Sequence, residues 1–150
     1  MAVPGCCPFE VRLGRHKYVD GGTVNPLPAR VFIGEKLEKT AAILTKPVDC
    51  ENEPPKFLER KIFWRYFHRH RWMLEKLWEA GHLYNEEVFF LEDLADDERS
   101  GVFIICPDKM PPARFLTTDK EQINRSIDMG YEKAARLEKG LRKFMAPPFQ

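Results

Sequence analysis

The chain has 150 residues, of which 43% are hydrophobic and 31% charged, and its formal net charge is +1. This length and composition predict a single globular domain with one core, and the near-neutral charge excludes the broad phosphate neutralisation on which general nucleic-acid binding depends. No apolar run approaches the roughly 18 residues of a membrane-spanning helix, and the N-terminus lacks the basic and apolar regions of a secretory signal. We therefore expect a cytoplasmic protein.

The cysteines show no spacing typical of metal ligands. They are Cys6, Cys7, Cys50 and Cys106, and the first two are adjacent. We expect free thiols in a reducing compartment rather than a disulfide framework. His68 and His70 fall within a helical pattern, where residues two apart point in different directions. The sequence therefore predicts neither a metal site nor a cofactor.

The chain begins with the pattern of a β-hairpin. Residues 9–13 alternate apolar and polar, which predicts a half-buried strand. Gly14 begins a turn, and residues 16–19 then predict the second arm of the hairpin. His16 lies within this arm, and we expect it to be a surface residue. The arm leads directly into Asp20.

Asp20 is followed by Gly21, Gly22 and an Asn25-Pro26 turn. Glycine tolerates positive φ and a close approach of other backbone, so this pattern displays a carboxylate at a strand end on a sharp bend. Folds with α/β sheets place their chemistry at the carboxyl ends of their strands. The same letters are also typical of an ordinary strand followed by an Asp-Gly turn.

Two further apolar runs predict the strands of a buried parallel sheet. They cover residues 41–45 and 102–106, and continuous apolar runs fit strands that are covered on both faces. A helical piece over residues 29–37 precedes the first run, and a long helical region separates the two. Together these elements predict an α/β layered fold.

The helical region combines aromatic and basic residues. Residues 63–78 carry apolar positions on one face of a helix and basic residues mostly on the other. We expect this helix to end at Gly81 and another to begin with Asn85 as its N-cap. Residues 56–76 hold seven Lys or Arg against two Glu, a local charge of +5. This basic face is either a solvated face whose charge is balanced by the acidic run at residues 86–98, or a surface that adsorbs to anionic lipid.

A final helix is predicted to begin with a capping box, in which Thr118 is the N-cap and Glu121 the acidic partner. Its apolar stripe consists of Ile123, Ile127, Tyr131, Ala134 and Leu141. The helix should end before Pro147, and packing on the sheet is sufficient to explain it.

Three of these features together resemble the patatin-like phospholipases, most closely their bacterial branch. They are the strand leading into Asp20-Gly21-Gly22, the Pro-x-Pro turn at residues 25–28, and the strand that ends in Ile43-Leu44-Thr45-Lys46-Pro47. The resemblance extends over residues 4 to 140. It implies a partial patatin-like three-layer fold with a mostly parallel sheet and flanking helices, of which residues 1–150 are the C-terminal portion.

The resemblance also implies an activity, the hydrolysis of lipid esters such as phospholipids by a Ser-Asp dyad. Asp20 would be the general base, and Gly21 and Gly22 would shape its turn. The nucleophile of the family lies in a Gly-x-Ser-x-Gly elbow near a glycine-rich oxyanion loop, and this sequence contains neither. Ser100 and Ser126 stand at no strand-to-helix elbow. We therefore expect the isolated chain to be inactive and to begin partway through the fold.

Two other interpretations stay open at this point. The chain could be a non-catalytic module that contacts a lipid surface or another protein through the basic aromatic helix, which would make it a peripheral membrane protein. It could also be an inactive remnant of a split gene. A sheet without all of its strands exposes an edge and an apolar face, so we expect self-association or binding to an upstream half of the same fold.

Overall fold

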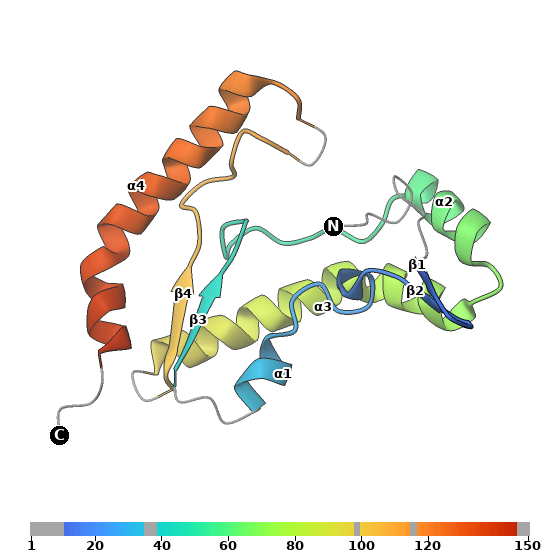
Figure 1. The fold of residues 1–150 in the computed structure, drawn as a ribbon, viewed down its shortest axis with the longest axis horizontal. Coiled ribbons are helices and arrows are strands. Elements are labelled where there is room, and N and C mark those ends of the chain that lie inside the picture. Colours follow the sequence, from blue (N-terminus) through green and yellow to red (C-terminus); the bar gives the residue numbers. More distant parts are fainter. Residues whose placement is uncertain (1–10, 35–38, 98–99, 115–116, 147–150) are drawn as a thin grey trace. The chain divides into compact units, whose positions relative to one another are not determined.

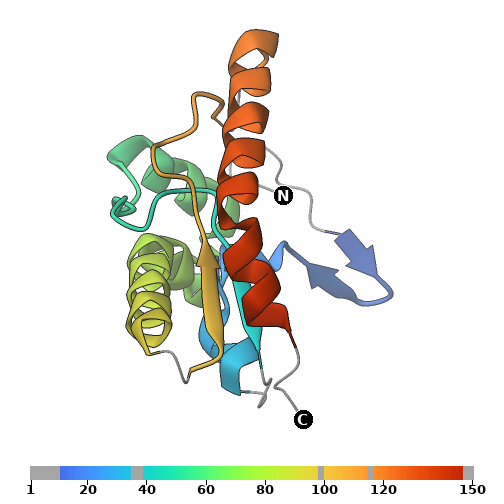
Figure 2. The same ribbon diagram turned by 90° about the vertical axis from the view of Figure 1, so that its left-hand side faces the viewer.

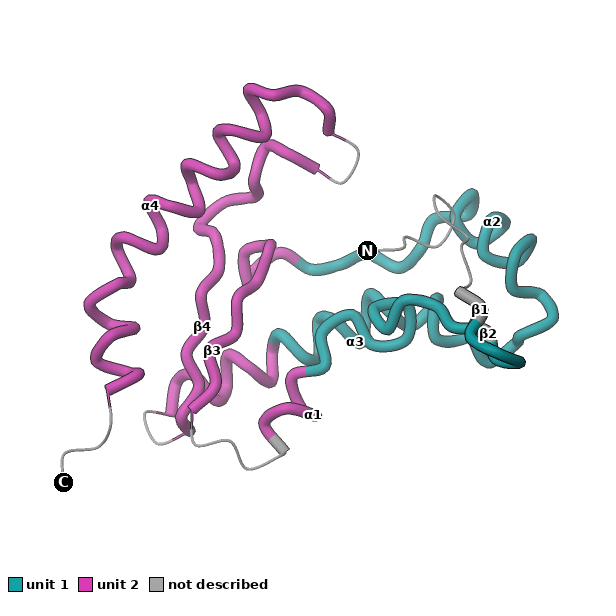
Figure 3. The backbone as a smooth tube through the Cα atoms, in the orientation of Figure 1, with its two compact units in different colours: residues 1–28, 51–88 teal, residues 29–50, 89–150 magenta. Residues whose placement is uncertain are grey.

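The structure is a computed structural model that describes residues 11–34, 39–97, 100–114 and 117–146 (Figure 1). The chain divides into two compact units (Figure 3). Unit 1 comprises residues 1–28 and 51–88, and unit 2 comprises residues 29–50 and 89–150. The long helix α3 (Arg71–Asp96) contributes to both units. The prediction of a single domain over residues 1–150 stays a prediction.

Unit 1 begins with the expected hairpin. Strands β1 (Val11–Leu13) and β2 (His16–Tyr18) pair antiparallel. Gly14 lies between them at φ +63°, in the left-handed region that glycine adopts without steric cost. The hairpin prediction is confirmed over these residues, and Phe9 and Glu10 lie outside the described part of the chain.

The helical region of unit 1 differs from the prediction. A single helix over residues 63–78 is wrong, because helix α2 (Phe57–Phe67) ends at a short turn and α3 begins at Arg71. The turn contains His68 and His70, which the sequence had placed on one continuous helix. Helical periodicity continues on both sides of this interruption, and the turn contains neither glycine nor proline, so the pattern gives no sign of the break.

Helix α3 continues through the positions where one helix was expected to end and another to begin. At Gly81, a Cβ atom would lie 2.9 Å from the backbone oxygen of Glu53. The glycine therefore lets another backbone segment pass close to the helix and does not end it. The Asn85 side chain accepts a hydrogen bond from Asn52 N–H at 2.8 Å and donates one to the Asn52 carbonyl at 3.1 Å. Both residues serve tertiary packing, so the predictions of a C-terminus at Gly81 and an N-cap at Asn85 are wrong.

Unit 2 contains a parallel pair of strands, β3 (Thr40–Ile43) and β4 (Val102–Ile105). Thr40 lies opposite Val102 and Ile43 opposite Ile105. The predicted α/β class and the parallel pairing are confirmed. In the described residues this sheet has two strands, flanked by helices. Helix α1 (Ala29–Gly34) precedes β3, and the remainder of the expected helical piece, residues 35–37, lies outside the described residues.

Helix α4 (Lys120–Met145) lies along β4, as Figures 1 and 2 show. The Phe103 ring on β4 is 5.4 Å from the Phe144 ring on α4. Lys39 donates hydrogen bonds to the carbonyls of Phe144 and Ala146, where a cation complements the C-terminal end of the helix. The expected packing of this helix on the sheet is confirmed.

The beginning of α4 is one residue away from its predicted position. The N-cap is Asp119, whose carboxylate accepts the N–H of Glu121 at 2.8 Å, and not Thr118. Both residue types are favoured N-caps, so the sequence alone did not separate them. The predicted apolar stripe is also partly wrong, because Tyr131 is 73% exposed while Lys133 and Leu137 are half-buried.

The loop after β4 is attached to α4 by ion pairs. Asp108 accepts hydrogen bonds from Lys133 Nζ and from an Arg136 guanidinium nitrogen, both at 2.5 Å. The hydrogen bond from Lys133, followed by the one from Arg136, holds the pKa of Asp108 below its ordinary value. The pairs therefore link the end of β4 to the middle of α4.

Candidate functional site around Asp20

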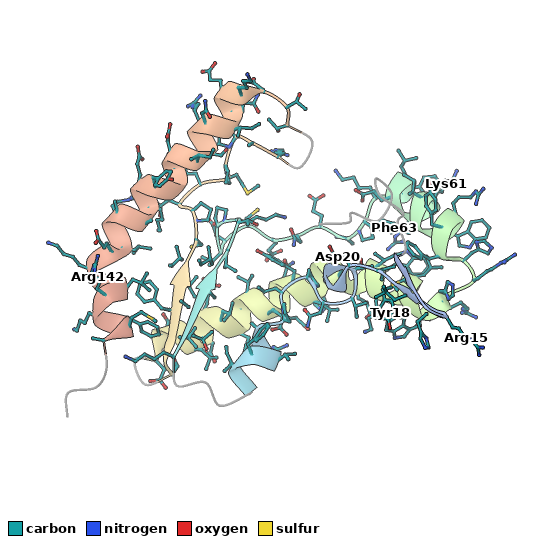
Figure 4. All side chains as sticks on the ribbon, viewed as in Figure 1. Arg15, Tyr18, Asp20, Lys61, Phe63 and Arg142 are labelled. Atoms are coloured by element: carbon teal, nitrogen blue, oxygen red, sulfur yellow. The ribbon has the colours of Figure 1, made fainter. Side chains whose placement is uncertain are left out.

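The predicted general base, Asp20, lies two residues after the end of β2 on a tight turn. It is the N-cap of a short 310 helix, η1 (Gly21–Thr23). Its Oδ1 accepts the N–H of Gly22 at 2.7 Å, and its backbone oxygen accepts the N–H of Thr23 at 3.0 Å. Asp20 is half-buried and Thr23 is buried. The expectation of a carboxylate displayed on a sharp bend after a strand is confirmed (Figure 4).

The two glycines of the motif have different roles from the one predicted. Neither has a positive φ; in the described residues only Gly14 and Gly101 do. A Cβ atom at Gly22 would lie 3.1 Å from Asp20 Oδ1, closer than ordinary contact, whereas one at Gly21 would meet no atom within 4 Å. Gly22 therefore leaves room for the close approach of the carboxylate, and it does not adopt a positive φ.

The turn continues compactly after Asp20. The N–H groups of Val24 and Asn25 both donate to the Gly21 carbonyl at 3.0 Å. Asn25 then forms a second side-chain turn, in which its Oδ1 accepts the N–H of Leu27 at 3.2 Å. Asp and Asn favour such turns because their short side chains reach the backbone two residues ahead. Residues 20–27 thus hold the carboxylate through local hydrogen bonds.

The strand that leads to Asp20 belongs to the predicted hairpin, so Asp20 does not lie at the carboxyl end of a strand of the parallel sheet. Within the described residues β2 pairs with β1 alone, and the parallel sheet consists of β3 and β4. Asp20 therefore follows a strand of an antiparallel hairpin. A strand of three residues pairs most readily with its neighbour in sequence, because the connecting loop is short.

Neither serine is arranged as a nucleophile. Ser126 lies within α4, where its hydroxyl donates to the Gln122 carbonyl and accepts the N–H of Ala113, both at 2.9 Å. Ser100 precedes β4, and its Oγ accepts the N–H of Val102 at 3.2 Å. Both hydroxyls satisfy nearby backbone groups. The expectation that they stand at no strand-to-helix elbow is confirmed.

The remaining candidate residues from the sequence are histidines and cysteines. His16 is exposed, as expected, with its ring 6.5 Å from that of Tyr18. Cys50 and Cys106 are free thiols, while Cys6 and Cys7 lie outside the described residues. In the part of the chain that is described, no three His, Cys, Asp or Glu side chains are grouped to hold a metal ion. None of the helices there is both long and apolar enough to cross a membrane.

The sequence pattern missed the outer face of α2. It had separated aromatic and basic residues onto opposite faces, but Phe57 and Trp64 are exposed beside Lys61 and Arg65. The signal for the earlier helix start was Glu59, whose Oε2 accepts the N–H of the N-cap residue at 2.7 Å.

Comparison of the chain with protein-family models, with curated proteins and with solved structures finds no match. The candidate site is therefore defined by the geometry of Asp20 and its turn.

Proposed function

We propose that the chain is the carboxyl-terminal part of a patatin-like serine acyl hydrolase, in which Asp20 is the general base of a Ser-Asp dyad. The observation that carries the proposal is the Asp20 turn. One carboxylate oxygen is fixed by the Gly22 N–H at 2.7 Å, which orients the side chain. A base must be held in one orientation to accept a proton from a nucleophile at hydrogen-bond distance.

In the proposed reaction, the Asp20 carboxylate takes the proton of a serine hydroxyl supplied by residues outside this sequence. The serine oxygen attacks the ester carbonyl carbon, and the tetrahedral intermediate collapses to an acyl-serine. The proton held by Asp20 passes to the leaving alcohol. Water then attacks the acyl-serine and gives one proton to Asp20, which returns it to the serine as the fatty acid leaves.

The sheet of unit 2 supports the proposal that the chain is part of a larger fold. In the described residues each of its strands has one partner, so each has an outer edge with unpaired backbone groups. Ile43 is 74% exposed on β3, although the apolar run predicts cover on both faces. Further strands and an additional layer would pair these edges and cover Ile43.

The test uses a fluorophosphonate probe, which labels activated serines, and a short-chain nitrophenyl ester. We expect neither labelling nor turnover with the chain alone, because it contains no serine elbow. When the chain is produced together with an upstream segment that carries a glycine-rich loop and a Gly-x-Ser-x-Gly elbow, we expect labelling of that serine and ester turnover.

Asp20→Asn is the decisive variant in the combined protein. Asparagine retains an oxygen that can accept the Gly22 N–H, so the turn is kept while the base is removed. Asp128→Asn on the exposed surface of α4 is the matched control for the same chemical change. Turnover that is lost in Asp20→Asn and kept in Asp128→Asn supports the proposal. Equal turnover in both variants, or probe labelling of Ser100 or Ser126 in the chain alone, refutes it.

A further inference from the structure

Helix α2 presents an exposed stripe of aromatic and basic side chains. Its members are Phe57, Lys61, Trp64 and Arg65 of α2 and the C-cap residue His68, whose spacing places them on one face of the helix. We call this set the α2 stripe. Phe57 is 74% and Trp64 60% exposed, and α2 contains no buried residue. Lys61, which lies on this stripe, and Phe63, which does not, are labelled in Figure 4.

The stripe is organised by contacts among its own members. Lys61 Nζ lies 4.7 Å from the centre of the Phe57 ring, which is a cation–π distance. The Trp64 and His68 rings are 5.4 Å apart. Aromatic rings and cations are therefore intermixed and face outward together, instead of being segregated into a buried and a solvated face.

The positive charge around the stripe is largely uncompensated. Among the described residues, no acidic partner is found for Arg65, or for Arg69 and Arg71 in the adjacent turn and helix start. The ion pairs of neighbouring lysines are with Glu53 and Glu79.

We propose that the α2 stripe is a docking surface for an anionic lipid–water interface. Such an interface attracts cations through its negative surface potential and accommodates aromatic rings at headgroup depth. Two exposed aromatic side chains beside arginines that have no acidic partner among the described residues match both properties. A helix face that contacts only water needs charged side chains and no exposed aromatic rings. The proposal concerns binding and is independent of the chemistry of Asp20.

The experiment measures partition of the full chain onto phosphatidylcholine vesicles with and without phosphatidylglycerol, by co-sedimentation and by tryptophan fluorescence. We expect binding to the anionic vesicles only, with a blue shift of the emission and a steep loss of binding with added salt. Each cation near an anionic surface contributes about fivefold to the partition coefficient. Lys61→Gln/Arg65→Gln should therefore weaken partition about 30-fold.

Two variants separate the stripe from general charge. Arg125→Gln/Lys139→Gln removes the same charge from exposed positions of α4 and should leave partition nearly unchanged. Trp64→Ala keeps the charge but should weaken binding and remove most of the blue shift. All of these positions are exposed, so circular dichroism should show unchanged helicity.

Three results would overturn the proposal. The first is equal binding to neutral and anionic vesicles. The second is an equal loss in the α2 and α4 double variants. The third is full competition by a soluble polyanion with no effect of Trp64→Ala, which would make the stripe a general polyanion site.

Discussion

Adding a methyl group at Gly81 tests the packing that the sequence pattern misread. Helix α3 passes residues 52–53 so closely that a Cβ atom at Gly81 would lie 2.9 Å from the Glu53 oxygen and 3.4 Å from the Asn52 oxygen. The neighbouring atoms are backbone, so relief requires the segment to move. That segment also carries the hydrogen bonds between Asn52 and Asn85, at 2.8 and 3.1 Å. Gly81→Ala should therefore disturb both contacts.

The expected magnitude follows from two opposing effects. Replacing glycine by alanine inside a helix stabilises it by about 1 kcal/mol where there is space. Loss of two hydrogen bonds costs about 1–3 kcal/mol. We expect Gly81→Ala to be destabilising by roughly 1–2 kcal/mol in total once the steric overlap is added. Gly130→Ala is the control, since a Cβ atom there meets nothing within 4 Å, and it should be stabilising by about 1 kcal/mol.

Urea unfolding provides the assay. Far-UV circular dichroism reports on helices of both units, while tryptophan fluorescence reports on unit 1, because Trp64, Trp72 and Trp78 all lie there. The midpoint should fall for Gly81→Ala and rise in circular dichroism for Gly130→Ala. Asn85→Ala should also be destabilising, and combining it with Gly81→Ala should give less than the sum of the two effects, because both act on the same segment.

A rise of the fluorescence midpoint for Gly81→Ala would refute this reasoning. Gly81 would then be an ordinary helix glycine, and the close passage of residues 52–53 would not exist in solution. Strict additivity with Asn85→Ala would likewise show that the two residues do not share a structural role.

Three further predictions concern the site, the pH dependence and the exposed sheet. Gly22→Ala should weaken the hydrogen bond to Asp20, seen as faster exchange of the residue-22 amide proton, while Gly21→Ala should not; equal exchange would contradict the contact. The pKa of Asp108 is lowered in the folded state, so its ion pairs stabilise the folded chain at pH values above the ordinary pKa of 3.8, and this stabilisation is lost as the pH falls below that value. Asp108→Asn should remove this part of the acid-induced unfolding transition. Identical acid unfolding curves for the two proteins would contradict the prediction. The purified chain should self-associate or bind a hydrophobic-surface dye, less so as Ile43→Thr, whereas a monomer by light scattering without dye binding would mean that the chain is autonomous.

Several of the features predicted correctly from the sequence have patterns that are visible within a few residues. The hairpin depends on alternation around Gly14, and the parallel strands are continuous apolar runs, so their patterns are visible locally. The Asp20 turn is closed by a hydrogen bond across two residues. For this turn the geometry was predictable, although the steric reason for Gly22 was not.

Two of the features predicted wrongly, at Gly81 and Asn85, are determined by contacts across long sequence separations. Asn85 is favoured at helix N-caps, but its side chain binds Asn52, 33 residues away. Gly81 is favoured after helix ends, but it accommodates the same distant segment. A local preference of about 1 kcal/mol is readily overcome by a pair of hydrogen bonds and close packing. For Gly81 and Asn85, tertiary contacts and not the neighbouring residues in sequence therefore decide which of two plausible roles the residue has.

The two proposed functional features also differ in how they are held. The Asp20 turn is held by hydrogen bonds among residues 20–27, and Thr23 within it is buried. Helix α2 has 11 residues and buries none of them, and isolated helices shorter than about 12–15 residues are marginal in water. If Asp20 is the proposed base, its orientation is set locally before a nucleophile is supplied, whereas the α2 stripe should gain the stabilisation that its own packing lacks only when a surface accepts its aromatic rings.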